Sequence, residues 1–218
     1  NDIMAPCAAC YNTLRAAARA VRDRDGRTAS INAGLAEIVG ASYAASIAVR
    51  HPLEIFSGRE MLARIRDKTV RPLEGLRLAP YYGCLLTRPK NVVAFDDSEQ
   101  PTAMDRLLAA LGADVRRWSY KTDCCGGALA LSQTDAVAAL VAKLAAEAGR
   151  AGAQAIVTAC PLCQINLDTR QGRAVRPLPV FYFTELMGIA FGAAGPDKWL
   201  RRHIIDPAPV IAALAKGE

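Results

Sequence analysis

Apolar positions repeat along the chain in two ways, and the two patterns alternate. Helical spacing marks the segments 13–24, 52–66, 102–113, 133–152, 161–171 and 184–192. Short, mostly apolar runs accompany them at 45–51, 76–83, 114–120, 153–159 and 178–183. Strands that alternate with helices through short linkers predict an α/β fold with a largely parallel sheet. Within it, we expect Thr102 to be a helix N-cap and Gly112 a C-cap.

Composition narrows the class of protein. Apolar residues fill 52% of the 218 positions, enough for a sizeable core. No run of about eighteen apolar residues predicts a membrane span, and the first residues lack the pattern of a secretory signal, so we expect a cytoplasmic protein. The net charge of +6 forms no stripe interleaved with aromatic residues. We therefore expect a solvated surface or a face for an acidic protein, and no nucleic-acid partner.

The positions of the cysteines are more informative than their number. There are seven, so they cannot all pair within the chain, and we expect reduced or metal-bound thiols. Three loci, at 84, 124–125 and 160, each follow the end of an expected strand. The carboxyl ends of parallel strands meet at one edge of a sheet. We therefore expect one site to gather the thiols of Cys84, Cys124, Cys125, Cys160 and Cys163.

Few kinds of site suit five thiols. A C-x-x-C pair at the start of a helix can bind one metal ion, or act as a redox dithiol because the helix N-terminus lowers the thiol pKa. Zinc binds four thiolates in a closed tetrahedron, typically from two such pairs. A fifth thiol and the adjacent Cys124 and Cys125 favour a multinuclear iron–sulfur cluster, with zinc as the alternative. Gly126 and Gly127 let the backbone approach such a cluster and donate N–H groups to its sulfurs.

The chain also contains a weak internal repeat. Residues 7–14 (CAACYNTL) match residues 160–167 (CPLCQINL), and residues 49–56 (VRHPLEIF) match residues 180–187 (VFYFTELM). The spacing between the two motifs is longer by 22 residues in the first copy. In the second copy a further cysteine precedes the C-x-x-C pair by 76 positions. We expect the first copy to have an equivalent upstream region with one cysteine and one Cys-Cys pair.

These stretches together resemble a known family. The pattern C-x39-CC-x34-C-x-x-C, with YYGCLLTRP, CCGGALALS, CPLCQINLD and ELMGIAFG, resembles the cysteine-rich CCG domain of the heterodisulfide reductase B subunit over nearly the whole chain. The resemblance implies two pseudo-repeated CCG-type domains with mostly parallel sheets, the first of them incomplete. Residues 1–70 would then be the C-terminal part of the first domain plus a linker, 71–195 the second domain, and 196–218 a tail helix.

The resemblance also implies a cofactor, which is a non-cubane [4Fe–4S] cluster for each complete motif. The second cluster would have five ligands, namely Cys84, Cys124, Cys125, Cys160 and Cys163. The first cluster would retain two ligands in this chain, Cys7 and Cys10. The edge formed by the thiols of Cys84, Cys124 and Cys125 would face the substrate. His51 follows an expected strand at the same edge, where it would be a proton donor to a leaving thiolate or a locally satisfied helix cap.

The implied function is that of a catalytic oxidoreductase subunit, which exchanges electrons with a disulfide or dithiol substrate. Its implied partners are the A and C subunits of a heterodisulfide-reductase-like complex, which are flavin-bearing and ferredoxin-like. The motif spellings resemble the bacterial version associated with sulfur oxidation, for which a dithiol-carrying protein would be the substrate carrier. Two alternatives stay open: an iron–sulfur subunit of a lactate-, glycolate- or succinate-oxidising complex, and a zinc-stabilised interaction module without a redox role.

Overall fold

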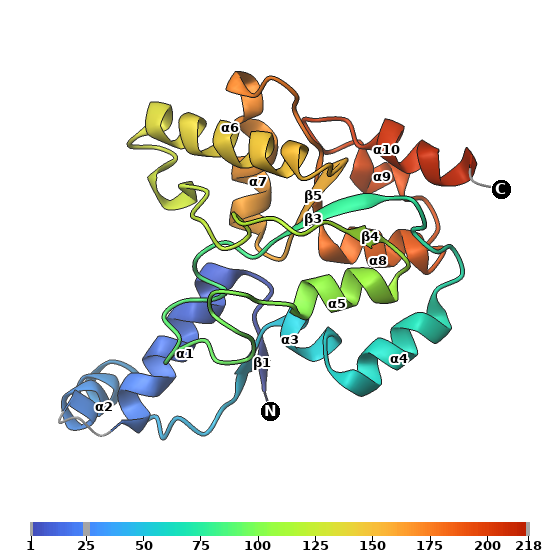
Figure 1. Cartoon of the computed structure of the whole chain (residues 1–218). Coiled ribbons are helices and arrows are strands. Elements are labelled where there is room, and N and C mark those ends of the chain that lie inside the picture. The colour runs from blue at the N-terminus through green and yellow to red at the C-terminus, as the bar shows by residue number, and fades with distance from the viewer. Residues whose placement is uncertain (1, 24–26, 217–218) are drawn as a thin grey trace.

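The structure, a computed structural model, describes residues 2–23 and 27–216 of the chain. Figure 1 shows a larger part built around a four-stranded sheet and a smaller part, blue and cyan, that contains the segments before residue 70. The two parts share one hydrophobic core. Tyr11 and Leu53 of the smaller part are buried in this core together with Leu78 and Phe181 of the larger part.

All strands of the larger sheet are parallel, in the order β4-β3-β5-β6. Their bounds are Arg77–Tyr81 for β3, Asp114–Val115 for β4, Ala155–Thr158 for β5 and Val180–Tyr182 for β6. The register places Leu78 opposite Ala155 and Ile156 opposite Val180. β3 and β5 are the central strands, and every residue of β5 is buried, as expected for a parallel sheet that is covered on both faces.

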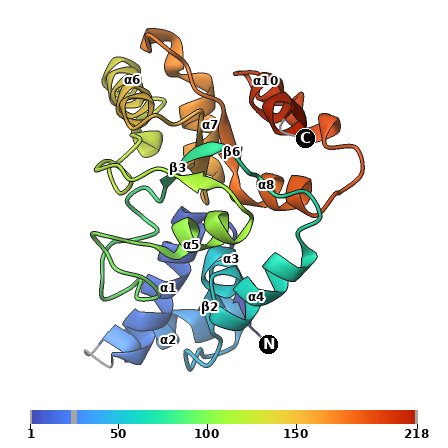
Figure 2. The same cartoon turned by 45° about the vertical axis from the view of Figure 1, so that its right-hand side comes forward.

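Helices supply that cover, with α6 and α7 on one side of the sheet and α5 and α8 on the other (Figures 1 and 2). Their bounds are Ala103–Ala110 for α5, Thr134–Arg150 for α6, Pro161–Thr169 for α7 and Phe183–Ala190 for α8. Shorter elements are α9 (Asp197–Leu200), α10 (Ala208–Ala212) and the 3₁₀ helices η1 (Gly127–Leu129), η2 (Gln171–Arg173) and η3 (Ala213–Lys216). The α/β class expected from the alternating pattern is confirmed.

The smaller part contains a second parallel pair of strands, β1 (Ile3–Met4) and β2 (Val49–Arg50), with Ile3 opposite Val49. Between these strands lie α1 (Ala8–Arg22) and α2 (Arg27–Val39), and after them come α3 (Pro52–Phe56) and α4 (Arg59–Lys68). Within the described residues, no helix has both the length and the apolar composition that crossing a membrane requires.

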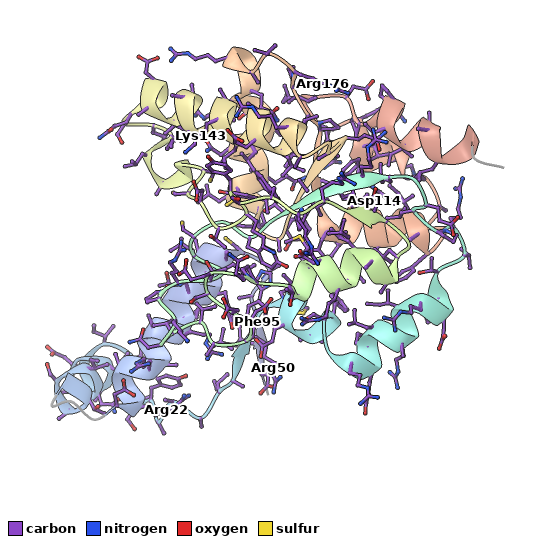
Figure 3. The ribbon with its side chains drawn as sticks, in the orientation of Figure 1. Arg22, Arg50, Phe95, Asp114, Lys143 and Arg176 are labelled. Atoms are coloured by element: carbon purple, nitrogen blue, oxygen red, sulfur yellow. The ribbon has the colours of Figure 1, made fainter. Side chains whose placement is uncertain are left out.

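Helix α1 joins the two parts through the loop that follows Cys84. The Asn12 amide donates to the carbonyl oxygens of Leu85 and Arg88, at 2.9 and 2.7 Å. Tyr11 packs edge-on against Phe95 of the same loop, with ring centroids 6.3 Å apart. Phe95 is labelled in Figure 3. These contacts hold the start of α1 beside the carboxyl edge of the larger sheet.

Two helices differ from the sequence-based expectation. α1 begins at Ala8 instead of Thr13, because Cys7 has extended backbone and serves as its N-cap. Its expected end at Arg24 lies outside the described residues. α2 was not expected at all, since the apolar residues of 27–39 do not gather on one helical face.

Two further differences have local causes. Residues 52–66 belong to two helices, because Ser57 ends the first helix and Gly58, with extended backbone, is the N-cap of the second. β4 ends at Val115 instead of Tyr120. β4 pairs with β3 only at Arg77 and Leu78. Beyond this pair, Pro80 of β3 has no N–H to donate, and its carbonyl oxygen accepts from the indole of Trp118, at 2.8 Å.

The caps of α5 follow the expectation in position but not in chemistry. Thr102 is the N-cap but makes no capping hydrogen bond with its side chain. The Asp96 carboxylate takes that role by accepting from the N–H groups of Thr102 and Ala103, at 2.8 and 2.6 Å. Gly112 directly follows the C-cap Leu111 and has a φ of +89°, the left-handed conformation that glycine adopts at a helix end.

Candidate metal centre

The cysteines lie at the carboxyl edge of the larger sheet, as their spacing predicts. Cys84 follows the end of β3, the adjacent pair follows β4, and Cys160 follows β5 as the N-cap of α7. The Sγ atoms of Cys125 and Cys163 lie 3.5 Å apart. Burial, together with the nearby Cys124 thiol, raises the pKa of Cys84 to about 11. Three strand ends therefore bring five thiols to one region.

The turn before Cys84 requires glycine. Gly83 has a φ of +66°, and its N–H donates to the carbonyl oxygen of Lys121 at 3.1 Å. A Cβ at this position would lie 3.3 Å from Cys163 Sγ. The missing side chain therefore leaves space directly beside one of the five sulfurs.

The adjacent cysteines differ in their exposure to solvent. Cys125 is buried and Cys124 is exposed. Gly126, with a φ of +77°, turns the chain so that its N–H donates to Cys124 Sγ at 3.2 Å. A Cβ on Gly127 would lie 3.4 Å from Cys125 Sγ. The two glycines thus provide the sharp turn and close backbone approach that the sequence predicts.

The three buried thiols differ in pKa, because they form hydrogen bonds with one another. A hydrogen bond from Cys163, helped by the N–H of Gly127, lowers the pKa of Cys125 to about 6. A hydrogen bond from Cys163 and backbone N–H groups, including that of Ala8, lower the pKa of Cys160 to about 5. The same two hydrogen bonds raise the pKa of Cys163. Cys125 and Cys160 therefore have the thiolate character that metal ligands need.

Asn166 belongs to this site although the sequence did not single it out. Its amide nitrogen donates to the carbonyl oxygen of Cys125 at 2.7 Å, and this hydrogen bond is buried. Its side-chain oxygen is also buried, and the described residues offer it no hydrogen-bond partner. Its position three residues after Cys163, on the same face of α7, is the sequence signal that could have identified it.

The residues of this site fit a metal group that is bound by thiolates. Within the described ranges, 2–23 and 27–216, no three His, Cys, Asp or Glu side chains converge on a point where one metal ion could bind. The five sulfurs are instead spread over the ends of three strands. Glycine leaves space beside two of them, at Gly83 and Gly127, and the Asn166 oxygen is free to accept. The donor set, all thiols, is the one that iron–sulfur clusters use.

Cys7 and Cys10 lie close to this site. Cys7 is the N-cap of α1 and half-buried, whereas Cys10 is exposed. Burial raises the pKa of Cys7, and the charge of Cys160 adds to this effect. The N–H of Ala8, directly after Cys7, in turn stabilises the Cys160 thiolate. The two C-x-x-C pairs are therefore neighbours, although they are far apart in the sequence.

His51 lies at the expected edge but is fully buried, and both of its ring nitrogens are engaged. Nδ1 accepts from the N–H of Leu53 at 3.1 Å, and Nε2 lies 3.0 Å from the carbonyl oxygen of Ala159. Burial lowers the pKa of His51 to about 4, so the ring is neutral. This geometry favours the helix-cap interpretation over the proton-donor role, which stays a prediction.

Comparison with known proteins agrees with the resemblance of the motifs. Residues 78–168 match the family model described as CCG: Cysteine-rich domain. The chain is 28% identical over 210 residues to the 8-methylmenaquinol:fumarate reductase membrane anchor subunit of Wolinella succinogenes, and the match covers 94% of this chain and 72% of that protein. It is also 28% identical to the B subunit of the ferredoxin/F(420)H(2)-dependent CoB-CoM heterodisulfide reductase of Methanosarcina acetivorans, over 98% of this chain and 73% of that protein.

A third relative is an Archaeoglobus profundus protein described as similar to the heterodisulfide reductase B subunit, 27% identical over 88% of this chain and 67% of the relative. The chain thus has a CCG cysteine-rich domain and is distantly related to subunits of oxidoreductase complexes. The match at 78–168 includes all five clustered cysteines, whereas Cys7 and Cys10 lie outside it.

Proposed function

We propose that the chain is the iron–sulfur subunit of a heterodisulfide-reductase-like complex, which exchanges electrons with a disulfide or dithiol substrate. The observation that carries this proposal is the gathering of five thiols at the carboxyl edge of one parallel sheet. The ligands of a non-cubane [4Fe–4S] cluster would be Cys84, Cys124, Cys125, Cys160 and Cys163. When bound, such a cluster supplies one-electron chemistry and iron to which sulfur can bind.

The exposure of the five cysteines would decide from which side a substrate reaches the cluster. Cys125, Cys160 and Cys163 are buried, so one side of the site is closed to water. Cys124 is exposed and Cys84 is half-buried, so the opposite side is open to a substrate. Gly126 would support the open side through the N–H that it donates to Cys124. We therefore place the substrate next to Cys84 and Cys124.

Residues 1–70 would be the C-terminal part of a first CCG-type domain, with Cys7 and Cys10 as two ligands of a further cluster. The pairing of the strands supports this proposal. The repeat makes Ile3 equivalent to Ile156 and Val49 equivalent to Val180, and these residues pair in the same way, Ile3 with Val49 and Ile156 with Val180. The shared register is the structural observation that supports a repeat.

The wider setting follows from the same family resemblance. The partners would be the flavin-bearing A and ferredoxin-like C subunits of the complex, in the cytoplasm. A dithiol-carrying protein would bring the substrate in a sulfur-oxidising version of the complex. The names of the relatives support membership of a reductase complex, since each names a subunit of a reductase or is likened to one.

A second candidate function has its own support. The Wolinella relative is a subunit of a reductase named for a menaquinol and fumarate, and it is as similar to this chain as the heterodisulfide reductase subunit. The chain would then be the iron–sulfur subunit of a complex that acts on a carboxylic acid such as succinate, and its cluster would only relay electrons.

Electron paramagnetic resonance (EPR) separates the two candidates. The protein is purified anaerobically, oxidised, and titrated with a small dithiol or with a water-soluble menaquinol analogue. The proposed function predicts that the dithiol changes the cluster spectrum at equilibrium, while the quinol only reduces the cluster. A spectrum that the dithiol leaves unchanged would contradict direct sulfur chemistry and support the relay function.

A further inference from the structure

Two hydrogen-bond donors cross between the repeated halves of the chain. His51, at the end of β2, has its Nε2 atom 3.0 Å from the carbonyl oxygen of Ala159, which precedes Cys160. Tyr182, the last residue of β6, donates its hydroxyl to the carbonyl oxygen of Pro6 at 2.6 Å, and Pro6 precedes Cys7. Each half therefore contacts the residue directly before the C-x-x-C pair of the other half.

The direction of the His51 hydrogen bond is fixed by its tautomer. Nδ1 accepts from the N–H of Leu53, so in the neutral ring the proton is on Nε2 and is donated to Ala159. The ring is fully buried, and water cannot replace this contact. Tyr182 also approaches the Ala159 oxygen, at 3.3 Å, so both donors reach this one carbonyl group.

The two donors occupy equivalent places in the repeat. His51 and Tyr182 are aligned by the sequence match, and both are N-caps of the helix after the second strand of a parallel pair, with φ, ψ of −88°, 143° and −79°, 135°. Their acceptors are equivalent too, because Cys7 and Cys160 are both N-caps with extended backbone. The contact is therefore a reciprocal exchange between the halves.

A carbonyl group and the N–H of the next residue belong to one rigid peptide plane. Holding the oxygen of Ala159 or Pro6 thus fixes the plane from which the following cysteine extends. We propose that His51 and Tyr182 are positioning residues that lock the Cys7–Cys10 and Cys160–Cys163 pairs in one relative orientation. A change in one half then alters the environment of the thiols in the other half.

Variants of His51 can remove one ring nitrogen's hydrogen bond at a time. His51→Asn keeps an acceptor for the Leu53 N–H but is too short to donate to Ala159, whereas His51→Gln keeps a donor at the position of Nε2. Tyr182→Phe removes the hydroxyl and keeps the ring. Tyr11→Phe is the matched control, because it removes a buried hydroxyl that contacts Glu54, at 3.3 Å, and neither carbonyl group.

The first readout rests on the proposed function and uses the anaerobic, cluster-bearing protein. We expect His51→Asn, a change in the first half, to shift the EPR spectrum and the midpoint potential of the cluster proposed at the five thiols. His51→Gln restores the wild-type spectrum, and Tyr11→Phe leaves it unchanged. A wild-type spectrum in folded His51→Asn and Tyr182→Phe proteins would overturn the proposal.

The second readout is independent of the cluster. In metal-free protein, the rate at which iodoacetamide alkylates Cys160 is followed by mass spectrometry. Loss of one buried hydrogen bond predicts labelling about tenfold faster in His51→Asn. Tyr182→Phe has a smaller effect, because its contact with Pro6 is exposed. If the protein binds no iron but labelling follows this order, the proposed function fails and the positioning role stands. Equal labelling rates in all proteins contradict the positioning role.

Discussion

The sulfur atoms of Cys125 and Cys163 lie 3.5 Å apart, although 38 positions separate the two residues in the chain. The first belongs to the Cys-Cys-Gly-Gly turn after β4, and the second to the first turn of α7. Their contact joins two strand ends that do not pair directly, since β3 lies between β4 and β5. It marks the centre of the buried side of the candidate cluster site.

We expect Cys125→Ser to lose the EPR signal of the cluster and most of the bound iron. Cys125 is buried, so an exposed thiol cannot take its place as a ligand. Cys10→Ser is the comparison variant, since Cys10 is exposed and is proposed as a ligand of the further site and not of the five-thiol group. It should retain the signal that Cys125→Ser removes. An unchanged iron content in Cys125→Ser would show that this thiol is not a ligand.

Gly83→Ala tests the space beside Cys163. The new Cβ would lie 3.3 Å from the sulfur, and the φ of +66° adds backbone strain of about 1–2 kcal/mol. Gly75→Ala is the control, because Gly75 has a similar φ of +75° but its Cβ would meet no atom within 4 Å. Both variants should unfold at lower temperature. Iron content should fall only in Gly83→Ala, and equal loss in both would mean that strain alone is responsible.

The contact between His203 and Glu185 makes a pH-dependent contribution to stability. Burial lowers the pKa of His203, but the hydrogen bond and charge of Glu185, 3.0 Å away, outweigh it and raise the pKa. A raised pKa in the folded state stabilises the protein fully below the unfolded value of about 6.5, and this stabilisation is lost as the pH rises through the folded pKa.

His203→Gln should therefore lower the melting temperature more at about pH 5.5 than at about pH 8.5, by a difference equivalent to about 1 kcal/mol. Gln keeps a neutral donor near Glu185, so the variant isolates the charge. Thermal unfolding of both proteins at the two pH values measures the effect. A difference that is the same at both values, or larger at the higher one, contradicts the assigned direction.

The sequence predicts that the five thiols gather, because this depends only on where each expected strand ends. The three loci at 84, 124–125 and 160 each come after an expected strand, and parallel strands end at a common edge. The contact of His51 with Ala159 spans 108 positions and depends on how the two halves pack, which no local pattern encodes. The capping role of Asp96 was also missed, because Thr102 is a good N-cap by composition, and only the folded loop brings the Asp96 carboxylate to the helix start.

The most direct test of the account is the metal and acid-labile sulfide content of the anaerobically purified protein. The proposed cluster predicts iron and sulfide in equal amounts, with no more than traces of zinc, and loss of most of both in Cys125→Ser. Zinc bound in stoichiometric amounts without sulfide would contradict the redox function, and would identify the thiols as a structural metal site.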